Sequence, residues 1–500
     1  MSQESTDIRA GGGEAVDEDA AQLAALGYTS EFKREMGLWA NLSLGFTYLS
    51  PVVGVYTLFA SSLATAGPPM IWALVIVGIG QFLVALVFGE VVAQYPVSGG
   101  IYPWARRLWG KRWAWMTGWV YMFALLSTIA SVAYGAAPYV AQVLGIESTT
   151  NASILCALAL IVISTAINFL GTKVVAYAAF VGFAAELLGA LAVGGWLLLT
   201  ERHYDLGVVF DTFGAGSSGS YLTAFTSAAL IGIFLYFGFE ACGDVAEEVA
   251  NPGIAIPKAM RLTVYIGGAA ATFVALALLL AVPDMGAVVS GKDADPVATA
   301  LTDAFGTTGV RVVLCVVLIS FLSCVMSLQA AASRLTYSYA RDKMVAGHRL
   351  FAKFSERRHV PPYALLLAAV VPALVIFVSK FSTDALTKIV SFASVGIYIG
   401  FQMVVLAALR ARLRGWNPGG KFSLGRWGTV VNAGAVAWGI CAIVVLIWPR
   451  TPDLAWYDNY LVLLAAAVVI GLGLVYMWVA KPYEHSDARA GDAIPAPSNA

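Results

Sequence analysis

Long, nearly charge-free hydrophobic stretches alternate with short polar segments along most of this chain. A helix needs about 20 mostly apolar residues to cross the hydrocarbon core of a bilayer. Twelve stretches reach that length: Leu38–Ala66, Pro69–Gly89, Trp113–Ile146, Asn151–Thr172, Val174–Thr200, Tyr221–Val249, Leu262–Pro283, Val312–Ser333, Pro361–Ser379, Ile389–Leu409, Trp427–Trp448 and Asn459–Ala480. The pattern predicts an all-α, polytopic membrane protein with twelve transmembrane helices and both termini on one side.

The basic residues predict which side that is, because short cytoplasmic loops are enriched in Lys and Arg. With the N-terminus inside, all but six of the 30 basic residues lie on the cytoplasmic side, including those of segments 106–112, 341–358 and 410–426. We therefore expect a multi-pass protein of the plasma (cytoplasmic) membrane. Residues 1–37 and 481–500 would form its cytosolic tails.

Composition narrows the possible functions. Only 12% of the residues are charged, against about 25% in soluble proteins. The 30 basic and 30 acidic residues balance, which leaves no positive field for nucleic acid. All four histidines lie outside the predicted spans, so neither a metal centre nor a Ser-His pair can form at bilayer depth. We predict a protein of the lipid bilayer with no enzyme activity, no cofactor and no metal.

Three acidic side chains are predicted to lie deep in the membrane: Glu186 in the fifth span, and Glu240 and Asp244 in the sixth. Ionisable groups at that depth are costly and are functional candidates by default. Glu90 lies near the inner end of the second span, where we expect it to pair with arginines.

Two spans contain helix-breaking residues, Ser50–Gly54 in the first and Tyr236–Gly243 in the sixth. Unwound backbone at membrane depth persists only where it is buried in protein or lines a cavity. Ordinary packing kinks are the alternative, but the two breaks occupy corresponding places in two five-span halves, as in inverted-repeat transporters. We predict repeats at 38–200 and 221–409, followed by two additional helices within 427–480.

Short motifs are distributed over nearly the whole chain, from Leu26 to about Met477. In order they are Leu26-Gly27-Tyr28 with Phe32-Lys33-Arg34, Ser50-Pro51-Val52-Val53-Gly54-Val55-Tyr56, Tyr95-Pro96-Val97-Ser98-Gly99-Gly100-Ile101-Tyr102 with Trp104-Ala105-Arg106-Arg107, Gly118-Trp119, Glu247-Glu248-Val249-Ala250-Asn251-Pro252 with Ile256-Pro257-Lys258-Ala259, Ser333-Arg334 and Ala340-Arg341-Asp342. Their order and spacing resemble the amino acid, polyamine and organocation (APC) transporters, and within them the amino acid/choline branch that includes GABA and choline permeases.

The resemblance implies a five-plus-five inverted repeat whose broken first and sixth helices enclose a substrate site with alternating access. In this family the first break usually holds a substrate carboxylate, and carbonyls of the sixth hold its amine. Here Pro51 and two valines replace the glycine-rich form of the first break, so fewer amide donors can reach an α-carboxylate. That departure resembles the GABA and choline branch.

The substrate-binding candidates lie at the two breaks and on aromatic positions, because aromatic faces attract ammonium groups. We expect Tyr236 and Phe239, which flank Gly238, to contact the substrate. The full set is Ser50, Pro51, Val52, Gly54, Trp119, Tyr236, Phe237, Gly238, Phe239 and Glu240.

The ion-coupling candidates are carboxyl and hydroxyl groups. Glu240 either pairs with a cationic amine or a proton, or it caps backbone amides of the sixth span. Proton-coupled members of the resembled family often carry a lysine in the fifth span, near the place where Glu186 lies here. Burial favours the neutral form of a carboxyl group, so Glu186 is either a proton carrier or a residue that only holds helices together. A sodium site would require hydroxyls of the eighth span, Ser320 and Ser323.

These features predict a proton-coupled secondary transporter, or permease, for a small amine-bearing solute such as an amino acid, GABA, choline or a polyamine. An exchanger or a sodium-coupled symporter of the same solutes is an alternative. A nutrient sensor of the same fold, which binds such ligands without transport, is the alternative from another functional class.

Overall fold

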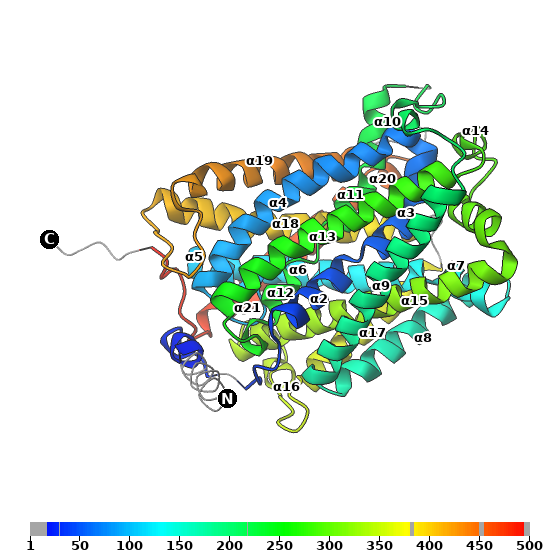
Figure 1. Ribbon diagram of the computed structural model, residues 1–500. Coiled ribbons are helices and arrows are strands. Elements are labelled where there is room, and N and C mark those ends of the chain that lie inside the picture. The colour runs from blue at the N-terminus through cyan, green and yellow to red at the C-terminus, as the bar shows by residue number, and fades with distance from the viewer. Residues whose placement is uncertain (1–17, 30, 218, 381–384, 450–454, 495–500) are drawn as a thin grey trace, which may run out of the picture.

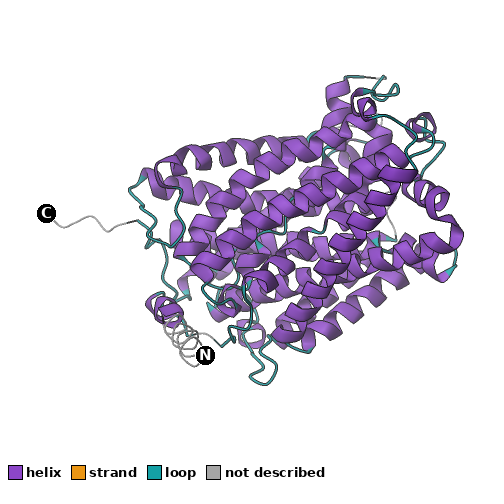
Figure 2. Cartoon of the chain, in the orientation of Figure 1, coloured by secondary structure: helices purple, strands orange, loops and turns teal. Residues whose placement is uncertain are grey.

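The computed structural model describes residues 18–29, 31–217, 219–380, 385–449 and 455–494. These residues form a bundle of packed helices (Figures 1 and 2), and the only β pairing among them consists of two isolated bridges, Met36 with Val249 and Ser355 with Val360. Within these described ranges, eleven helices are long and apolar enough to cross a membrane. The predicted all-α, polytopic class is confirmed.

The helices follow the predicted stretches. The first five spans correspond to α2 (Leu38–Leu49) with α3 (Pro51–Ala66), α4 (Ile71–Gln94), α6 (Lys111–Gly135) with α7 (Ala137–Leu144), α8 (Thr150–Phe169) and α9 (Thr172–Thr200). The seventh to twelfth correspond to α13 (Pro252–Ala281), α15 (Pro296–Arg341), α17 (Pro362–Ser379), α18 (Ala385–Leu413), α19 (Gly428–Ile447) and α21 (Leu461–Ala480). Short helices between them are α5 (Ile101–Leu108), α14 (Met285–Val289), α16 (His348–Phe351) and α20 (Trp456–Asn459).

The sixth predicted span has no helix of spanning length. It is divided into α10 (Tyr221–Ala228), α11 (Leu230–Leu235) and α12 (Ala241–Asp244). The first span is also interrupted, because α2 ends at Leu49 and α3 begins at Pro51. The two breaks expected from Pro51 and Gly238 are therefore present.

The helix of the eighth span starts earlier than its hydrophobic stretch. The Asp295 side chain accepts a hydrogen bond from the amide of Ala298 at 3.0 Å, which caps the first turn of α15. The chain bends within α15 at Gly306, where φ is 64°. Hydropathy marks only the apolar part of this helix, so the polar first turns were not predicted as part of the eighth span.

The breaks lie at the centre of the bundle, where α2 and α3 contact α9, α13 and α15. On the other side α18 lies along α6 and α13 lies along α4, while α19 and α21 pack on the outside. The first and last described segments of the chain lie at one end of the bundle, which we call the terminal face, and α10 and α14 lie at the opposite end (Figure 1).

Candidate functional site

The two breaks have backbone conformations that a regular helix cannot contain. Ser50 adopts φ 41° and ψ 91°, and its hydroxyl accepts a hydrogen bond from the amide of Val53 at 3.3 Å. Pro51 then occupies the first turn of α3, where its missing N–H has no cost. In the sixth span Gly238 has φ 120°, which glycine adopts readily because it has no Cβ.

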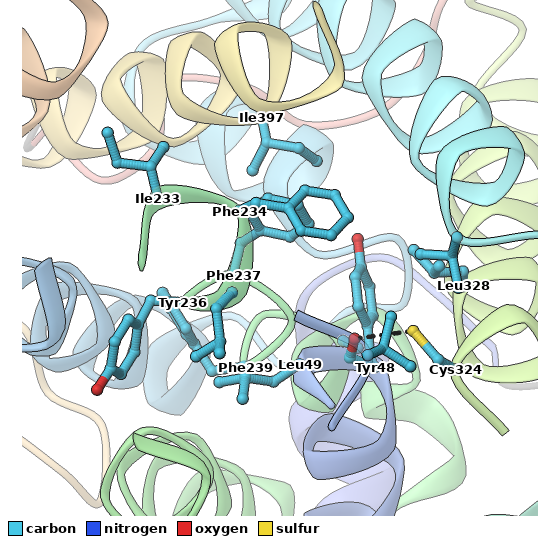
Figure 3. Packing of buried hydrophobic residues seen from close by; sticks show 14 of the residues in the cluster. Tyr48, Leu49, Ile233, Phe234, Tyr236, Phe237, Phe239, Cys324, Leu328 and Ile397 are labelled. Atoms are coloured by element: carbon cyan, nitrogen blue, oxygen red, sulfur yellow. Dashed lines mark hydrogen bonds between the residues drawn. The ribbon is translucent and has the colours of Figure 1, made fainter. Parts of the chain in front are cut away.

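The breaks pack directly against each other (Figure 3). A Cβ on Gly238 would lie 2.5 Å from the amide nitrogen of Leu49, and a Cβ on Gly54 would lie 2.8 Å from the Leu235 side chain. Each broken span thus presents a glycine to a leucine of the other. Ser50, Pro51, Val52, Gly54, Phe237 and Gly238, all predicted site residues, are brought together here.

Glu186 of α9 binds the break in the first span. Its Oε1 accepts hydrogen bonds from the Ser50 hydroxyl at 2.7 Å and from the Val52 amide at 2.9 Å. The side chain is buried, and its Oε2 has no hydrogen-bond partner among the described residues. One carboxylate oxygen therefore holds the start of α3, where exposed amides favour negative charge, while the other oxygen is uncommitted.

A small cavity lies beside Glu186, between α3, α9, α13 and α15. Val52, Tyr56 and Ser320 contribute to its wall, and most of the remaining lining is aliphatic. The space open to the centre of a water-sized sphere is about 20 Å³, enough for about one water molecule. The Glu186 side chain thus borders a space that holds about one water molecule.

Glu240 belongs to the break in the sixth span. Its Oε2 accepts a hydrogen bond from the Gly238 amide at 2.7 Å, and its Oε1 accepts one from the Tyr121 hydroxyl of α6 at 3.0 Å. The capping interaction considered for this residue is present. Tyr121 in addition links the break to α6, a contact that sequence spacing gave no means to assign.

The aromatic candidates lie in three different environments. Tyr48 and Phe237 form an edge-to-face pair beside the breaks (Figure 3), with ring centroids 6.4 Å apart. Phe239 packs against Phe88 and Phe401 in the interior. Phe237 and Phe239 are thus buried near the breaks, where each packs against other aromatic rings.

Tyr236 and Trp119 point elsewhere. The Tyr236 hydroxyl lies between Gly78 and Gly268, at 2.7 and 2.6 Å from where their Cβ atoms would be, and the ring lines a groove of about 490 Å³ between α4 and α13. The Trp119 indole donates to the carbonyl of Val469 in α21 at 2.9 Å. Neither side chain faces the junction of the breaks, contrary to our expectation, because packing with other helices determines the direction of each.

The serine candidates for a sodium site form hydrogen bonds within their own helix. The Ser323 hydroxyl donates to the carbonyl of Ile319 at 2.8 Å, and that of Ser320 donates to Val316 at 3.4 Å. Ser320 lines the cavity beside Glu186. Such back-bonding is common for hydroxyls in membrane helices, so the arrangement gives no specific support for sodium.

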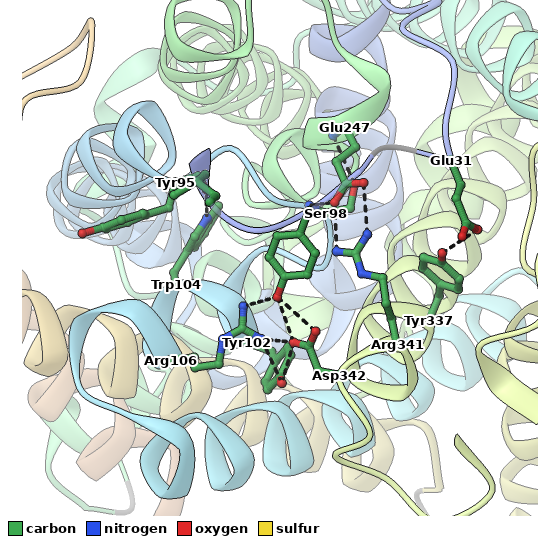
Figure 4. A network of polar contacts seen from close by, with 12 residues as sticks. Glu31, Tyr95, Ser98, Tyr102, Trp104, Arg106, Glu247, Tyr337, Arg341 and Asp342 are labelled. Atoms are coloured by element: carbon green, nitrogen blue, oxygen red, sulfur yellow. Dashed lines mark hydrogen bonds and ion pairs between the residues drawn. The ribbon is translucent and has the colours of Figure 1, made fainter. Parts of the chain in front are cut away.

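A network of ion pairs closes the terminal face (Figure 4). Asp342 pairs with Arg106 and accepts hydrogen bonds from the hydroxyls of Tyr28 at 3.0 Å and Tyr102 at 2.8 Å. Beside it, two arginines of α15 form further ion pairs: Arg341 with Glu247 at 3.0 Å, and Arg334 with Glu248 at 2.8 Å. We call this set the terminal clasp; its members are Tyr28, Tyr102, Arg106, Glu247, Glu248, Arg334, Arg341 and Asp342.

The C-terminal segment adds contacts to the clasp. Asp492 pairs with Arg107 of α5, and Asp487 pairs with Lys343 at 3.0 Å. The hydrogen bond from the Lys343 ammonium holds the pKa of the Asp487 carboxyl below its usual value. These partners are separated by well over 100 residues in the chain, so no local sequence signal could have predicted them.

Comparison of the sequence with known protein families shows the family to which this chain belongs. The model of the amino acid permease family matches residues 37–473, which include both breaks and all the spanning helices up to α19. This chain belongs to the amino acid permease family. The predicted resemblance to APC transporters is thereby confirmed.

Similar permeases occur in plants and fungi. The chain is 26% identical to the amino-acid permease BAT1 of Arabidopsis thaliana, over 91% of this chain and 93% of that protein. It is 25% identical to amino-acid permease 2 of Neurospora crassa, over 90% and 85%. It is also 23% identical to a putative polyamine transporter of Candida albicans, over 87% and 82%. The similarity extends along nearly the full length in each case.

Proposed function

We propose that this permease is a proton-coupled secondary transporter of small amine-bearing solutes, which works by alternating access in the plasma membrane. The observation that carries the proposal is the contact between Glu186 and the break of the first span. A buried carboxyl group bonded to the Ser50 hydroxyl and the Val52 amide changes those bonds when it gains or loses a proton. Protonation is thereby linked to the conformation of the substrate site.

The chemistry of the breaks favours an amine over an α-carboxylate as the recognised group. The Val52 amide is already used by Glu186, so it cannot also bind a substrate carboxylate. Glu240, with Tyr48 and Phe237 nearby, offers a carboxylate and aromatic faces, which bind ammonium groups. GABA, choline and polyamines therefore fit this site better than standard α-amino acids. The similar proteins are named amino-acid permeases and, in one case, a putative polyamine transporter, so their names support an amino acid or amine as substrate without favouring either.

The terminal face would be cytosolic, because the basic segments 106–112, 341–358 and 410–426 gather there. Under this orientation the terminal clasp is a closed cytosolic gate. Substrate would enter from the outside, and separation of the clasp would release it inside.

Uptake into proteoliposomes tests the function. Purified protein should accumulate labelled GABA, choline, putrescine or an amino acid when the lumen is made alkaline relative to the outside. Accumulation that follows a sodium gradient instead would assign a sodium-coupled symporter, and counterflow without net accumulation an exchanger. Ligand-dependent thermal stabilisation with no flux of any solute would identify a sensor and overturn the proposal.

Replacing Asp342 by Asn should shift the protein toward the cytosol-open state. Arg106 would lose its counter-charge while buried, and breaking a buried ion pair in this way costs about 3–5 kcal/mol. Cys242 of α12 is fully buried, and α12 is followed directly by the segment that carries Glu247 and Glu248 of the clasp. Its reaction with a membrane-permeant maleimide, followed by peptide mapping at fixed pH, should accelerate by at least about tenfold.

Asp487→Asn is the matched control, because that carboxyl group is exposed and contacts Lys343 at the surface. It should leave the labelling rate near that of the unaltered protein. Equal labelling of Cys242 in Asp342→Asn and in the unaltered protein would show that the clasp does not hold the gate closed.

A further inference from the structure

Asp244 is a buried acid without a partner. It ends α12 and its exposed fraction is 0%. Neither carboxyl oxygen has a hydrogen-bond partner among the residues that the structure describes. Buried polar groups are nearly always paired, so an exception requires an explanation.

Each of the other buried acids considered near the terminal face has a cationic partner. Glu247 and Glu248 pair with arginines of α15, and Asp342 pairs with Arg106. Glu90 pairs with Arg412 of α18, as we expected for that residue. Asp244 differs from them in having no cation beside it.

The groups that face Asp244 come from each element around it. Glu240 is the residue before α12, and its carboxyl group interacts electrostatically with Asp244. Tyr48 of α2 and Tyr121 of α6 are titratable neighbours, and the Ser338 side chain of α15 lies against Gly99 of the adjoining turn. Cys242 of α12 is a further titratable neighbour. The arginines of α15, Arg334 and Arg341, are committed to Glu248 and Glu247.

The turn that precedes α5 covers the carboxyl group tightly. A Cβ on Gly100 would lie 2.4 Å from Asp244 Oδ1, and a Cβ on Gly99 would lie 2.6 Å from the Ser338 side chain. The Gly99 amide donates to the Asp244 backbone carbonyl at 2.9 Å. On this side only glycine leaves room for the acid.

We propose that Asp244 is a proton-binding site of the gate, occupied while the terminal clasp is closed and emptied when it opens. An unpaired carboxylate in the interior costs several kcal/mol, whereas the neutral acid avoids most of that cost. The proton would come from cytosolic water as the gate closes and would return to it when opening hydrates the carboxyl group. That the terminal face lies in the cytosol is taken from the proposed function; the rest of the inference does not depend on it.

The backbone links this proton to the clasp. Gly100 is the residue before α5, and α5 carries Arg106 and Arg107. Water can reach Asp244 on this side only if the turn moves, and moving the turn displaces α5 and its two arginines. Hydration of Asp244 and separation of the clasp are therefore parts of one movement.

The sign of the pH dependence follows from this linkage. The closed state binds one proton more than the open state, so low cytosolic pH favours closure. Above the pH at which Asp244 in the open state gives up its proton, the closed-to-open ratio should fall by up to about tenfold per pH unit.

Energy transfer between two fluorophores can measure this ratio without any transport. The labels would be attached to cysteines introduced as Glu35→Cys, before α2, and Arg357→Cys, in the loop after α16. Both positions are exposed on the terminal face. Cys156, Cys242, Cys315 and Cys441 would be replaced by Ser to prevent labelling elsewhere. We expect the high-transfer, closed population of the purified protein to decrease as pH rises, and Asp244→Asn to stay closed because Asn resembles the neutral acid in shape.

Asp211→Asn, at an exposed position near the opposite end of the bundle, is the control and should keep the pH dependence. Asp244→Ser serves as a second neutral variant if Asp244→Asn fails to fold. An unchanged slope in a folded neutral variant, or no pH dependence in the unaltered protein, would overturn the proposal. Because the readout is conformational, a protein that transports nothing can still pass or fail this test.

Discussion

Glu186→Gln should abolish accumulation driven by a pH gradient while exchange continues. Gln keeps an oxygen that can accept from Ser50 or Val52, so the start of α3 remains held, but it cannot release a proton. A gradient of one pH unit can support up to about tenfold accumulation for each coupled proton. In the variant that ratio should fall to about one, as measured by uptake of labelled solute into proteoliposomes.

Glu201→Gln provides a matched control, because Glu201 follows the same helix, α9, at its far end and should retain full accumulation. Counterflow of labelled against unlabelled solute tells loss of coupling from loss of folding. If Glu186→Gln accumulates solute as well as the unaltered protein, Glu186 is a packing residue, and coupling must be assigned to another acid.

Local rules made much of the fold predictable. Each span is a run of apolar residues, and its length alone identifies it. The breaks were predictable because Pro51 lacks an amide and Gly238 permits a positive φ, both properties of single residues. The acids were predictable because scarcity of charge in the spans singles out Glu186, Glu240 and Asp244.

Side-chain direction was not predictable in the same way. Tyr236 lies one residue from Phe237, yet only Phe237 packs beside Tyr48. Tyr236 instead passes between Gly78 and Gly268, two glycines on other helices. Which side of the break a ring occupies depends on space that distant residues leave, and a single sequence does not specify that pairing.

The contacts of the terminal face show the same limit. Arg106 and Asp342 each belong to recognisable motifs, but their pairing depends on how α5 and α15 pack. Asp492 lies in a polar tail with no hydrophobic pattern, so its contact with Arg107 could not be predicted from the sequence. Long-range polar pairs are thus the part of the site that required the structure.

Gly238→Ala should eliminate transport and lower thermal stability. A non-glycine residue at positive φ costs about 1–2 kcal/mol, and the added Cβ would lie 2.5 Å from the amide nitrogen of Leu49. Backbone cannot move aside as the end of a flexible side chain can, so the two breaks must separate. We expect uptake at or near background and a lower melting temperature in detergent.

Gly110→Ala separates the effect of backbone strain from the effect of the contact with Leu49. Gly110 has φ 134°, but a Cβ there would have nothing within 4 Å, so this variant has the strain without the contact. It should lose some stability and keep most of its transport. Full uptake by Gly238→Ala would contradict the proposed site, because the junction of the two breaks could then widen at no cost to function. Uptake lost equally in both variants would show that backbone strain, rather than the contact with Leu49, accounts for the effect.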